Sequence, residues 1–316
     1  MPIPNALRDR LEIPVVAAPM FLVSGPDLVV ETCRAGVLGT FPALNQRSSD
    51  GYAAWLDEIA ERLDGQRPRA APFGVNLIVH RSNARLNADL EITVAKRVPL
   101  VITSLGAVSD VVDAVHSYGG LVFHDVVNLR HAEKAAAAGV DGLIAVCAGA
   151  GGHAGLLSPF AFVSELRDIF AGTLLLSGSM TTGAHVAAAR LMGADLAYIG
   201  TRFIATQESM APQSYKDMVL AARAKDIVYT SAISGVHGNF LRPSIAAAGL
   251  DPDHLPEKSD VHIGGDEKRA WKNIWSAGQG VGGISDIPTA GQLCARIAGE
   301  YRAALVGAAL PAEAVG

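Results

Sequence analysis

Eight short apolar runs, separated by segments with helical character, constrain the fold of this 316-residue chain more than any other feature. Each run has about the length of a buried β-strand. Strands that alternate with helices predict βαβ units and a parallel sheet. Continuous apolar runs are typical of strands that are buried on both faces. The eight runs are residues 13–19, 37–44, 73–79, 100–105, 121–127, 142–146, 174–177 and 196–200.

Eight strands within about 200 residues match a closed (β/α)8 barrel, a fold of about 250 residues with its helices. An open, doubly wound sheet is the alternative. That sheet more often carries a glycine fingerprint after its first strand, whereas the first run here leads into Ala18-Pro19-Met20. We therefore predict an α/β fold of the TIM-barrel type.

The βα pattern ends near residue 207. Residues 207–224 have helical character, 227–243 are mixed, and 251–265 are polar and rich in proline and glycine. A final helix is predicted over 289–305. We expect a barrel built from 1–207 and 285–316, with a small, mostly helical inserted domain at 208–284 that caps the substrate site.

Composition excludes several classes of protein. Half of the residues are hydrophobic, the formal net charge is -5, and the basic residues are scattered, which is unlike a nucleic-acid-binding surface. No run of about 18 apolar residues could span a membrane, and charged residues precede the first apolar run, unlike a signal peptide. The three cysteines form no CxxC pair, so we expect neither a metal site nor disulfides. We predict a cytoplasmic protein with a small-molecule partner, no nucleic-acid or membrane partner, and a sequence compatible with a homo-oligomer.

A glycine-rich segment with one histidine, Ala148–Gly155, follows the sixth run. Glycine lets a backbone approach a ligand closely, and the active groups of TIM barrels lie at the C-terminal ends of the strands. An imidazole also changes its charge near neutral pH. His153 is therefore the candidate catalytic residue. The alternative is a flexible loop that happens to contain a histidine.

Two further loops suggest a phosphate site. Residues 176–180 follow the seventh run and 199–202 follow the eighth, and TIM barrels commonly bind phosphate with these two loops. Small residues leave backbone N–H groups free for an anion. Each loop by itself could also be an ordinary glycine turn. The candidate phosphate ligands are Ser177, Gly178, Ser179, Gly200 and Thr201.

Polar residues near other strand ends are weaker candidates. Asn76 lies within an apolar run, where an unpaired amide would be costly to bury, so it binds a ligand or holds a loop. Ser104 and Asp125 also lie near strand ends. His237, in the predicted insertion, could contact substrate or stabilise its own loop.

Several of these segments together resemble the nitronate monooxygenase family, formerly called 2-nitropropane dioxygenase and related to flavin-type enoyl-acyl carrier protein reductases. They are Pro-Val-Val-Ala-Ala-Pro-Met at 14–20, Gly-Val-Asn-Leu at 74–77, Ala-Gly-Gly-His-Ala-Gly at 150–155, Met-Gly-Ala-Asp at 192–195 and Ile-Gly-Thr-Arg-Phe-Ile-Ala-Thr at 199–206. The similarity runs in order over 13–206 and resumes at 280–296. It implies an FMN-containing TIM barrel with a small inserted substrate domain.

The resemblance also implies an activity and a set of contacts. The activity is oxidation of alkyl nitronates, or of nitroalkanes, with O2 to a carbonyl compound and nitrite, and His153 matches the catalytic histidine. Ser177, Gly178, Ser179, Gly200 and Thr201 would hold the FMN phosphate. The remaining implied cofactor contacts are Ala18, Pro19, Met20, Asn76, Ser104, Asp125, Ala150, Gly151 and Gly152.

Three differences from the family pattern bear on the chemistry. Asp125 stands where many relatives have lysine. Gly149 and Val146 stand where many have glutamate and a polar residue. The phosphate loop reads Ser177-Gly178-Ser179-Met180 in place of a double glycine. Two other functions stay open: an NAD(P)H-dependent flavin reductase of quinones or enoyl thioesters, and a flavin-free barrel isomerase or lyase that binds a phosphate.

Overall fold

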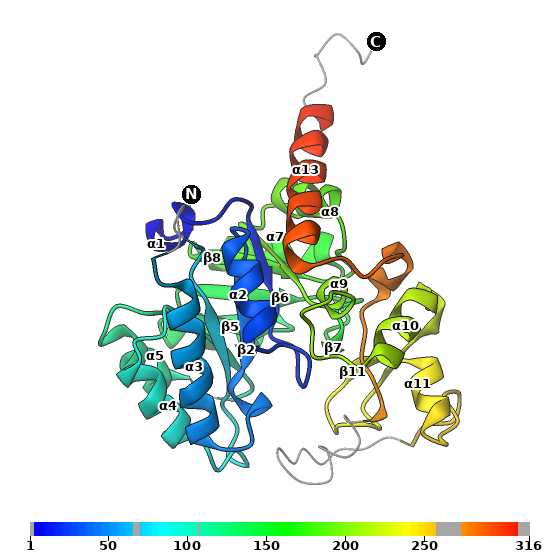
Figure 1. The fold of residues 1–316 in the computed structure, drawn as a ribbon, viewed down its shortest axis with the longest axis horizontal. Helices are drawn as coiled ribbons and strands as arrows, with labels where there is room; N and C mark the ends of the chain where they lie inside the picture. The colour runs from blue at the N-terminus through cyan, green and yellow to red at the C-terminus, as the bar shows by residue number, and fades with distance from the viewer. Residues whose placement is uncertain (1–2, 66–69, 107, 257–272, 309–316) are drawn as a thin grey trace.

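The protein is built on a closed barrel of eight parallel strands (Figure 1). The structure is a computed structural model that describes residues 3–65, 70–106, 108–256 and 273–308. The last barrel strand pairs with the first, with Val15 opposite Ala197, so the TIM barrel is confirmed and the open sheet is excluded. Each strand overlaps one of the predicted runs. The strands are β1 Val15–Ala17, β2 Leu38–Pro42, β3 Gly74–Ile78, β4 Leu100–Ser104, β5 Leu121–Val126, β6 Gly142–Val146, β8 Thr173–Ser177 and β9 Leu196–Ile199.

The interior of the barrel is packed with apolar side chains. Val16, Leu38, Phe123 and Ile144 belong to one buried cluster. Leu7, from the short helix α1 (Asn5–Arg8), packs into the same cluster. The barrel interior is therefore filled by side chains from its strands and from α1.

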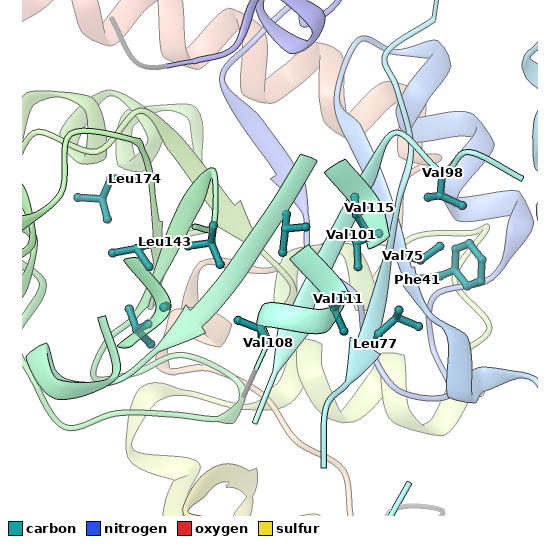
Figure 2. Close-up of a cluster of buried hydrophobic side chains, with 14 of the residues drawn as sticks. Phe41, Val75, Leu77, Val98, Val101, Val108, Val111, Val115, Leu143 and Leu174 are labelled. Atoms are coloured by element: carbon teal, nitrogen blue, oxygen red, sulfur yellow. The ribbon is translucent and has the colours of Figure 1, made fainter. Parts of the chain in front are cut away.

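Helices cover the outside of the barrel, and the main apolar core lies between them and the strands. Figure 2 shows part of it, where Val111 and Val115 of one helix approach Val75 and Val101 of the strands. Asn128 caps the N-terminus of α6, where its side chain accepts a hydrogen bond from the His131 N–H at 2.9 Å. The surrounding helices are α2 Pro26–Arg34, α3 Ser49–Leu63, α4 Leu86–Ala95, α5 Ser109–His116, α6 Leu129–Ala137, α7 Pro159–Ile169, α8 Gly183–Leu191 and α13 Ala290–Ala308.

The C-terminal helix α13 packs on α8 (Figure 1). A Cβ at Gly183 would collide with the α13 backbone at Ile297 and Tyr301. The N–H of Gly183 instead donates to Glu300 Oε2 at 2.7 Å. A residue without a side chain thus allows the two helices to meet closely, and this contact fixes the returning chain on the barrel.

The segment between β9 and α13 lies to one side of the barrel in Figure 1. Its strands β10 and β11 form a three-stranded antiparallel sheet with β7, a two-residue strand from the glycine-rich segment. The helices of this segment were expected, but its strands were not, and residues 257–272 of the predicted insertion lie outside the described residues. Its elements are α10 Gln213–Ala221, η2 Ala224–Asp226, β10 Ile227–Thr230, β11 Gly238–Leu241, α11 Arg242–Ala247 and η3 Gln279–Gly283, and β7 is Gly152–His153. Over the part of the chain that the structure covers, no helix is long and apolar enough to cross a membrane.

Candidate active site

A cavity opens where the barrel strands end. It collects residues that are far apart in the sequence because parallel strands of a barrel all finish at the same rim. Every predicted site residue except His237 lines it, although their individual roles stay predictions. These residues are Ala18, Pro19, Met20, Asn76, Ser104, Asp125, Ala150, Gly151, Gly152, His153, Ser177, Gly178, Ser179, Gly200 and Thr201.

The turn after β1 forms an apolar wall of this cavity, and hydrogen bonds hold it in place. The Nδ2 of Asn45 donates to the carbonyl oxygens of Met20 (3.0 Å) and Ser24 (2.8 Å). The N–H of Met20 donates to Ser24 Oγ at 3.0 Å. The turn therefore presents Ala18, Pro19 and Met20 as a fixed surface for a flat, apolar ligand.

Three polar residues at neighbouring strand ends form a hydrogen-bonded row. Asn76 of β3 is only 7% exposed, and its Nδ2 donates to the Ile102 carbonyl (3.2 Å) and to Ser104 Oγ (2.9 Å). Ser104 of β4 donates to Asp125 Oδ2 of β5 at 2.6 Å. Asn76 is thus fully paired on its donor side, and the row fixes the orientation of the Asp125 carboxyl group.

Asp125 is the acidic residue of this cavity. Burial raises the pKa of its carboxyl group to about 6, and the hydrogen bond from Ser104 opposes that rise. The other carboxyl oxygen, Oδ1, is buried and has no hydrogen-bond partner. A buried polar atom without a partner costs free energy, so its position in a cavity wall is consistent with a ligand that supplies the missing partner.

The loops after β8 and β9 line the cavity with backbone and small side chains. Gly178 (φ +147°) and Ser179 (φ +54°) have positive φ, and their N–H groups have no hydrogen-bond acceptor within the described residues. Thr201 Oγ1 accepts a hydrogen bond from the Gly278 N–H at 2.9 Å, which leaves its hydroxyl hydrogen free. No lysine or arginine of the described chain lines the cavity, so an anion here would meet neutral donors.

Arg202, which follows Thr201 in the sequence, forms an ion pair with Asp286. Arg202 is 3% exposed, and its guanidinium pairs with Asp286 at 2.6 Å. Asp286 also pairs with Arg296 of α13 at 2.6 Å. These pairs link α9 (Thr201–Ile204) to the segment that leads into α13. Arg202 therefore stabilises the conformation of the loop after β9.

The glycine-rich segment is held by the inserted chain and is not a free loop. Asn239 Nδ2 of β11 donates to the Ala150 carbonyl at 2.7 Å, and the Gln279 N–H donates to the Gly149 carbonyl at 2.9 Å. His153 lies on β7 opposite Gly238. The exposed part of its side chain faces cavity space, since it lines the cavities on both sides. The surrounding protein lowers the pKa of His153 to about 4 through desolvation, so the imidazole is neutral at pH 7.

A second cavity lies next to the first, and His237 lines this one. The ring of His237 stacks on Tyr229 with centroids 5.1 Å apart, and its carbonyl accepts a hydrogen bond from the Ala154 N–H at 3.2 Å. It therefore has a structural role in addition to any contact with substrate. The two cavities share Ser104, Leu105, Asp125, Val146, His153 and Val236.

Several cavity residues from the inserted segment were not predicted. Gly278 and Gly280 lie in a glycine cluster, Gly278–Gly283, that could have identified this stretch. Ser276 accepts a hydrogen bond from the hydroxyl of Tyr215, whose ring stacks on Trp275. Nothing in the local sequence signals this contact. Across the described ranges, no group of three or more histidine, cysteine or acidic residues is arranged to hold a metal ion.

Comparisons with known proteins agree with this architecture. The family model described as nitronate monooxygenase matches residues 6–300. A nitronate monooxygenase from Paraburkholderia phytofirmans is 28% identical over 82% of this chain and 81% of its own length. FabK from Thermotoga maritima has a similar structure (TM-score 0.79, 23% identity, 96% of each chain). So does a nitroalkane oxidase from Streptomyces ansochromogenes (TM-score 0.80, 23% identity, 96% of this chain and 100% of that one).

Proposed function

Because the chain belongs to the nitronate monooxygenase family of oxidoreductases, we propose that it uses FMN to oxidise alkyl nitronates with O2, giving a carbonyl compound and nitrite. One observation carries the proposal. The pairing of β7 with β11 holds the neutral imidazole of His153 in place. This imidazole lines both the cavity at the strand ends and the second cavity beside it. A base in that position can reach a small substrate that lies against a flat cofactor.

The residues of the first cavity fit FMN. The apolar wall at Ala18–Met20 suits the face of a ring system, and the unpartnered Oδ1 of Asp125 suits a polar ring edge. The free N–H groups of Gly178 and Ser179 suit a phosphate. When bound, FMN would supply the electron chemistry with the substrate and O2, and the protein would supply orientation and electrostatics.

His153 would act first as a base. In a neutral nitroalkane the carbon next to the nitro group carries an acidic hydrogen. Transfer of that proton to His153 would leave the nitronate anion beside a cationic imidazolium, and the opposite charges would hold the anion in place. The low pKa of His153 keeps the imidazole in the neutral form that this step needs at pH 7. A nitronate that is already ionised would not need the step.

The second cavity would hold the rest of the substrate. Leu105, Val127 and Leu157 provide apolar surface in it, and His153 and Asp125 separate it from the first cavity. A substrate with an alkyl group on the nitro-bearing carbon could therefore place that group away from the cofactor. His237 lines the same cavity and is a candidate contact.

The proposal is tested with purified protein and propane-2-nitronate. Mass spectrometry of the released cofactor should identify FMN, and acetone and nitrite should form in equal amounts as O2 is consumed. A colourless protein that releases no flavin would exclude the proposal and favour a flavin-free isomerase or lyase. Rapid oxidation of NAD(P)H with a quinone or an enoyl thioester, without turnover of nitronates, would favour the reductase alternative.

A further inference from the structure

Asp125 has one carboxyl oxygen that the protein satisfies and one that it leaves open. Oδ2 accepts a hydrogen bond from Ser104 at 2.6 Å. Oδ1 is buried, has no partner, and belongs to a residue that lines both cavities. A buried oxygen without a partner is costly, and this one belongs to a residue that lines the space in which FMN is proposed to bind.

The row of hydrogen bonds determines which oxygen can carry a proton. Asn76 Nδ2 can only donate, so Ser104 Oγ must be the acceptor in their 2.9 Å contact. The hydroxyl hydrogen of Ser104 then points to Asp125, and Oδ2 is an acceptor. With the Ser104 hydrogen donated to Oδ2, a proton on this carboxyl group sits on Oδ1, the oxygen that has no hydrogen-bond partner within the described residues.

We propose that Asp125 acts as a neutral carboxylic acid that donates a hydrogen bond from Oδ1 to an acceptor atom of the FMN ring. Asn76 and Ser104 are positioning residues that hold the donor on the correct oxygen. This inference rests on the proposed function, because it needs FMN in the first cavity. It gives Asp125, the one acidic residue among the described residues that line that cavity, a role that an ionised carboxylate could not have.

The surroundings of Asp125 favour the neutral form. The other titratable side chains that line the first cavity are Tyr198 of β9, Tyr215 of α10 and His153 of β7, and none of them is a cation at pH 7. Burial raises the pKa of Asp125 to about 6, and a hydrogen bond from the protonated form to FMN would raise it further. The second cavity adds His80, His124, His131, Lys134, His237 and Tyr229.

The first experiment measures the FMN dissociation constant of the apoprotein at pH 5.5 to 8.5, by quenching of flavin fluorescence. If FMN binds preferentially to protonated Asp125, it must bind more weakly as the carboxyl group ionises. The FMN phosphate also titrates, with a pKa of about 6, and this changes affinity in every variant. The dissociation constant of the wild type is therefore divided by that of Asp125→Asn at the same pH. We expect this ratio to rise about fivefold or more between pH 6 and pH 8, since each pKa unit by which FMN raises the pKa of Asp125 adds up to a tenfold change over the whole titration.

The asparagine variant is the matched replacement. Ser104 would keep the amide oxygen at the Oδ2 position and leave the NH2 group at the Oδ1 position, where it donates at every pH. Asp125→Asn should therefore bind FMN at pH 8 more tightly than the wild type does, whereas Asp125→Ala should bind FMN more weakly than Asp125→Asn at every pH. Asp113→Asn, which removes a carboxylate from the exposed surface of α5, should behave like the wild type.

Ser104→Ala tests the positioning role. The hydrogen bond from Ser104 holds the pKa of Asp125 down, so its removal should move the midpoint of the pH-dependent ratio to higher pH. A purely structural role for Ser104 would change affinity without moving the midpoint.

The opposite model makes the opposite prediction. If Asp125 were an ionised acceptor for an N–H of the ring, the ratio would fall as the pH rises, and Asp125→Asn would bind FMN more weakly at pH 8. Either result would overturn the inference while the protein still binds FMN. If the wild type binds no FMN at any pH, the proposed function fails as well. Infrared difference spectra provide an independent readout: the carbonyl band of a neutral carboxylic acid should appear in the FMN complex at pH 7 and be absent from Asp125→Asn.

Discussion

The side chain of Ser179 fills the space into which any side chain at residue 149 would project. A Cβ built on Gly149 would overlap Ser179 Oγ and would also lie 3.0 Å from Gln279 Oε1. Ser179 Oγ itself lies 3.5 Å from the Gly149 carbonyl. Residues 149 and 179 are two of the positions at which the resemblance described above led us to expect a difference from the family pattern. The two residues are in contact, so the glycine and the serine accommodate each other.

The contact predicts coupling between two substitutions. Gly149→Ala should lower the free energy of unfolding by at least about 2 kcal/mol, from its positive φ and the steric overlap. Adding Ser179→Gly should return about 1 kcal/mol or more, within the usual range for residues in contact. Urea unfolding of the apoprotein measures both. Gly152→Ala is the control, because Gly152 has φ +70° but open space around its Cβ. Ser179→Gly should not rescue it, and equal rescue of both variants would mean that the overlap is not the cause.

His153→Asn should retain FMN, since it removes no donor from the proposed phosphate side. Turnover of neutral nitroalkanes should fall about 10²–10⁴-fold, the usual contribution of a general base, with a smaller loss on nitronates that are already ionised. Because the neutral imidazole is the active form and its pKa is lowered to about 4, kcat/KM for nitroethane at saturating FMN should decline only as the pH falls toward 4. A decline with a midpoint near 6.5 would show that His153 is an ordinary solvated histidine.

Asp125 should make the stability of the apoprotein depend on pH. Its pKa is about 6 in the folded state and 3.8 in the reference state, so between these values the folded state binds more protons than the unfolded state. The contribution of Asp125 to stability should therefore fall as the pH rises from 4 to 6, by about 3 kcal/mol, and then level off. In Asp125→Asn this contribution should be absent, so the stability of the variant should rise with pH relative to the wild type over this range. Chemical denaturation at a series of pH values measures it, and an unchanged profile in the variant would show that Asp125 ionises normally.

His124, the preceding residue of β5, should have the opposite effect. It is buried against Thr103, with Nδ1 and Oγ1 2.8 Å apart, and burial lowers its pKa from 6.5 to about 4. Between these values the unfolded state binds more protons, so stability should fall as the pH drops from 6.5 to 4, by about 3 kcal/mol. His124→Gln should remove this acid sensitivity. The two residues oppose each other in the wild type, so the comparison is made between His124→Gln and Asp125→Asn. Identical profiles for the two variants would contradict both assignments.

The barrel could be predicted because each of its strands is encoded by a short, continuous stretch of sequence. Parallel strands buried on both faces are apolar along most of their length, and each such run was visible in the sequence. Barrel closure then places all strand ends at one rim, so Asn76, Ser104, Asp125 and the loops after β8 and β9 could be expected in one cavity. Their hydrogen bonds were not predicted, because they depend on which side chains of neighbouring strands point inward.

The inserted sheet could not be predicted for a different reason. Its strand β7 consists of Gly152 and His153 only, which is too short to show a pattern, and its partner residues Gly238 and Asn239 lie about 85 positions away along the chain. The rigidity of the glycine-rich segment comes from this pairing. His153 lines the cavity, and the reason it is held there is visible only in the structure.

Anaerobic mixing of the FMN-loaded enzyme with propane-2-nitronate, while the visible absorbance of the flavin is recorded, tests the central claim most directly. We predict rapid loss of the oxidised flavin absorbance with the nitronate, and recovery when O2 is admitted. NADH in place of the nitronate should leave the absorbance unchanged on the same time scale. Rapid bleaching by NADH with no response to the nitronate would contradict the account and identify the protein as a nicotinamide-dependent reductase.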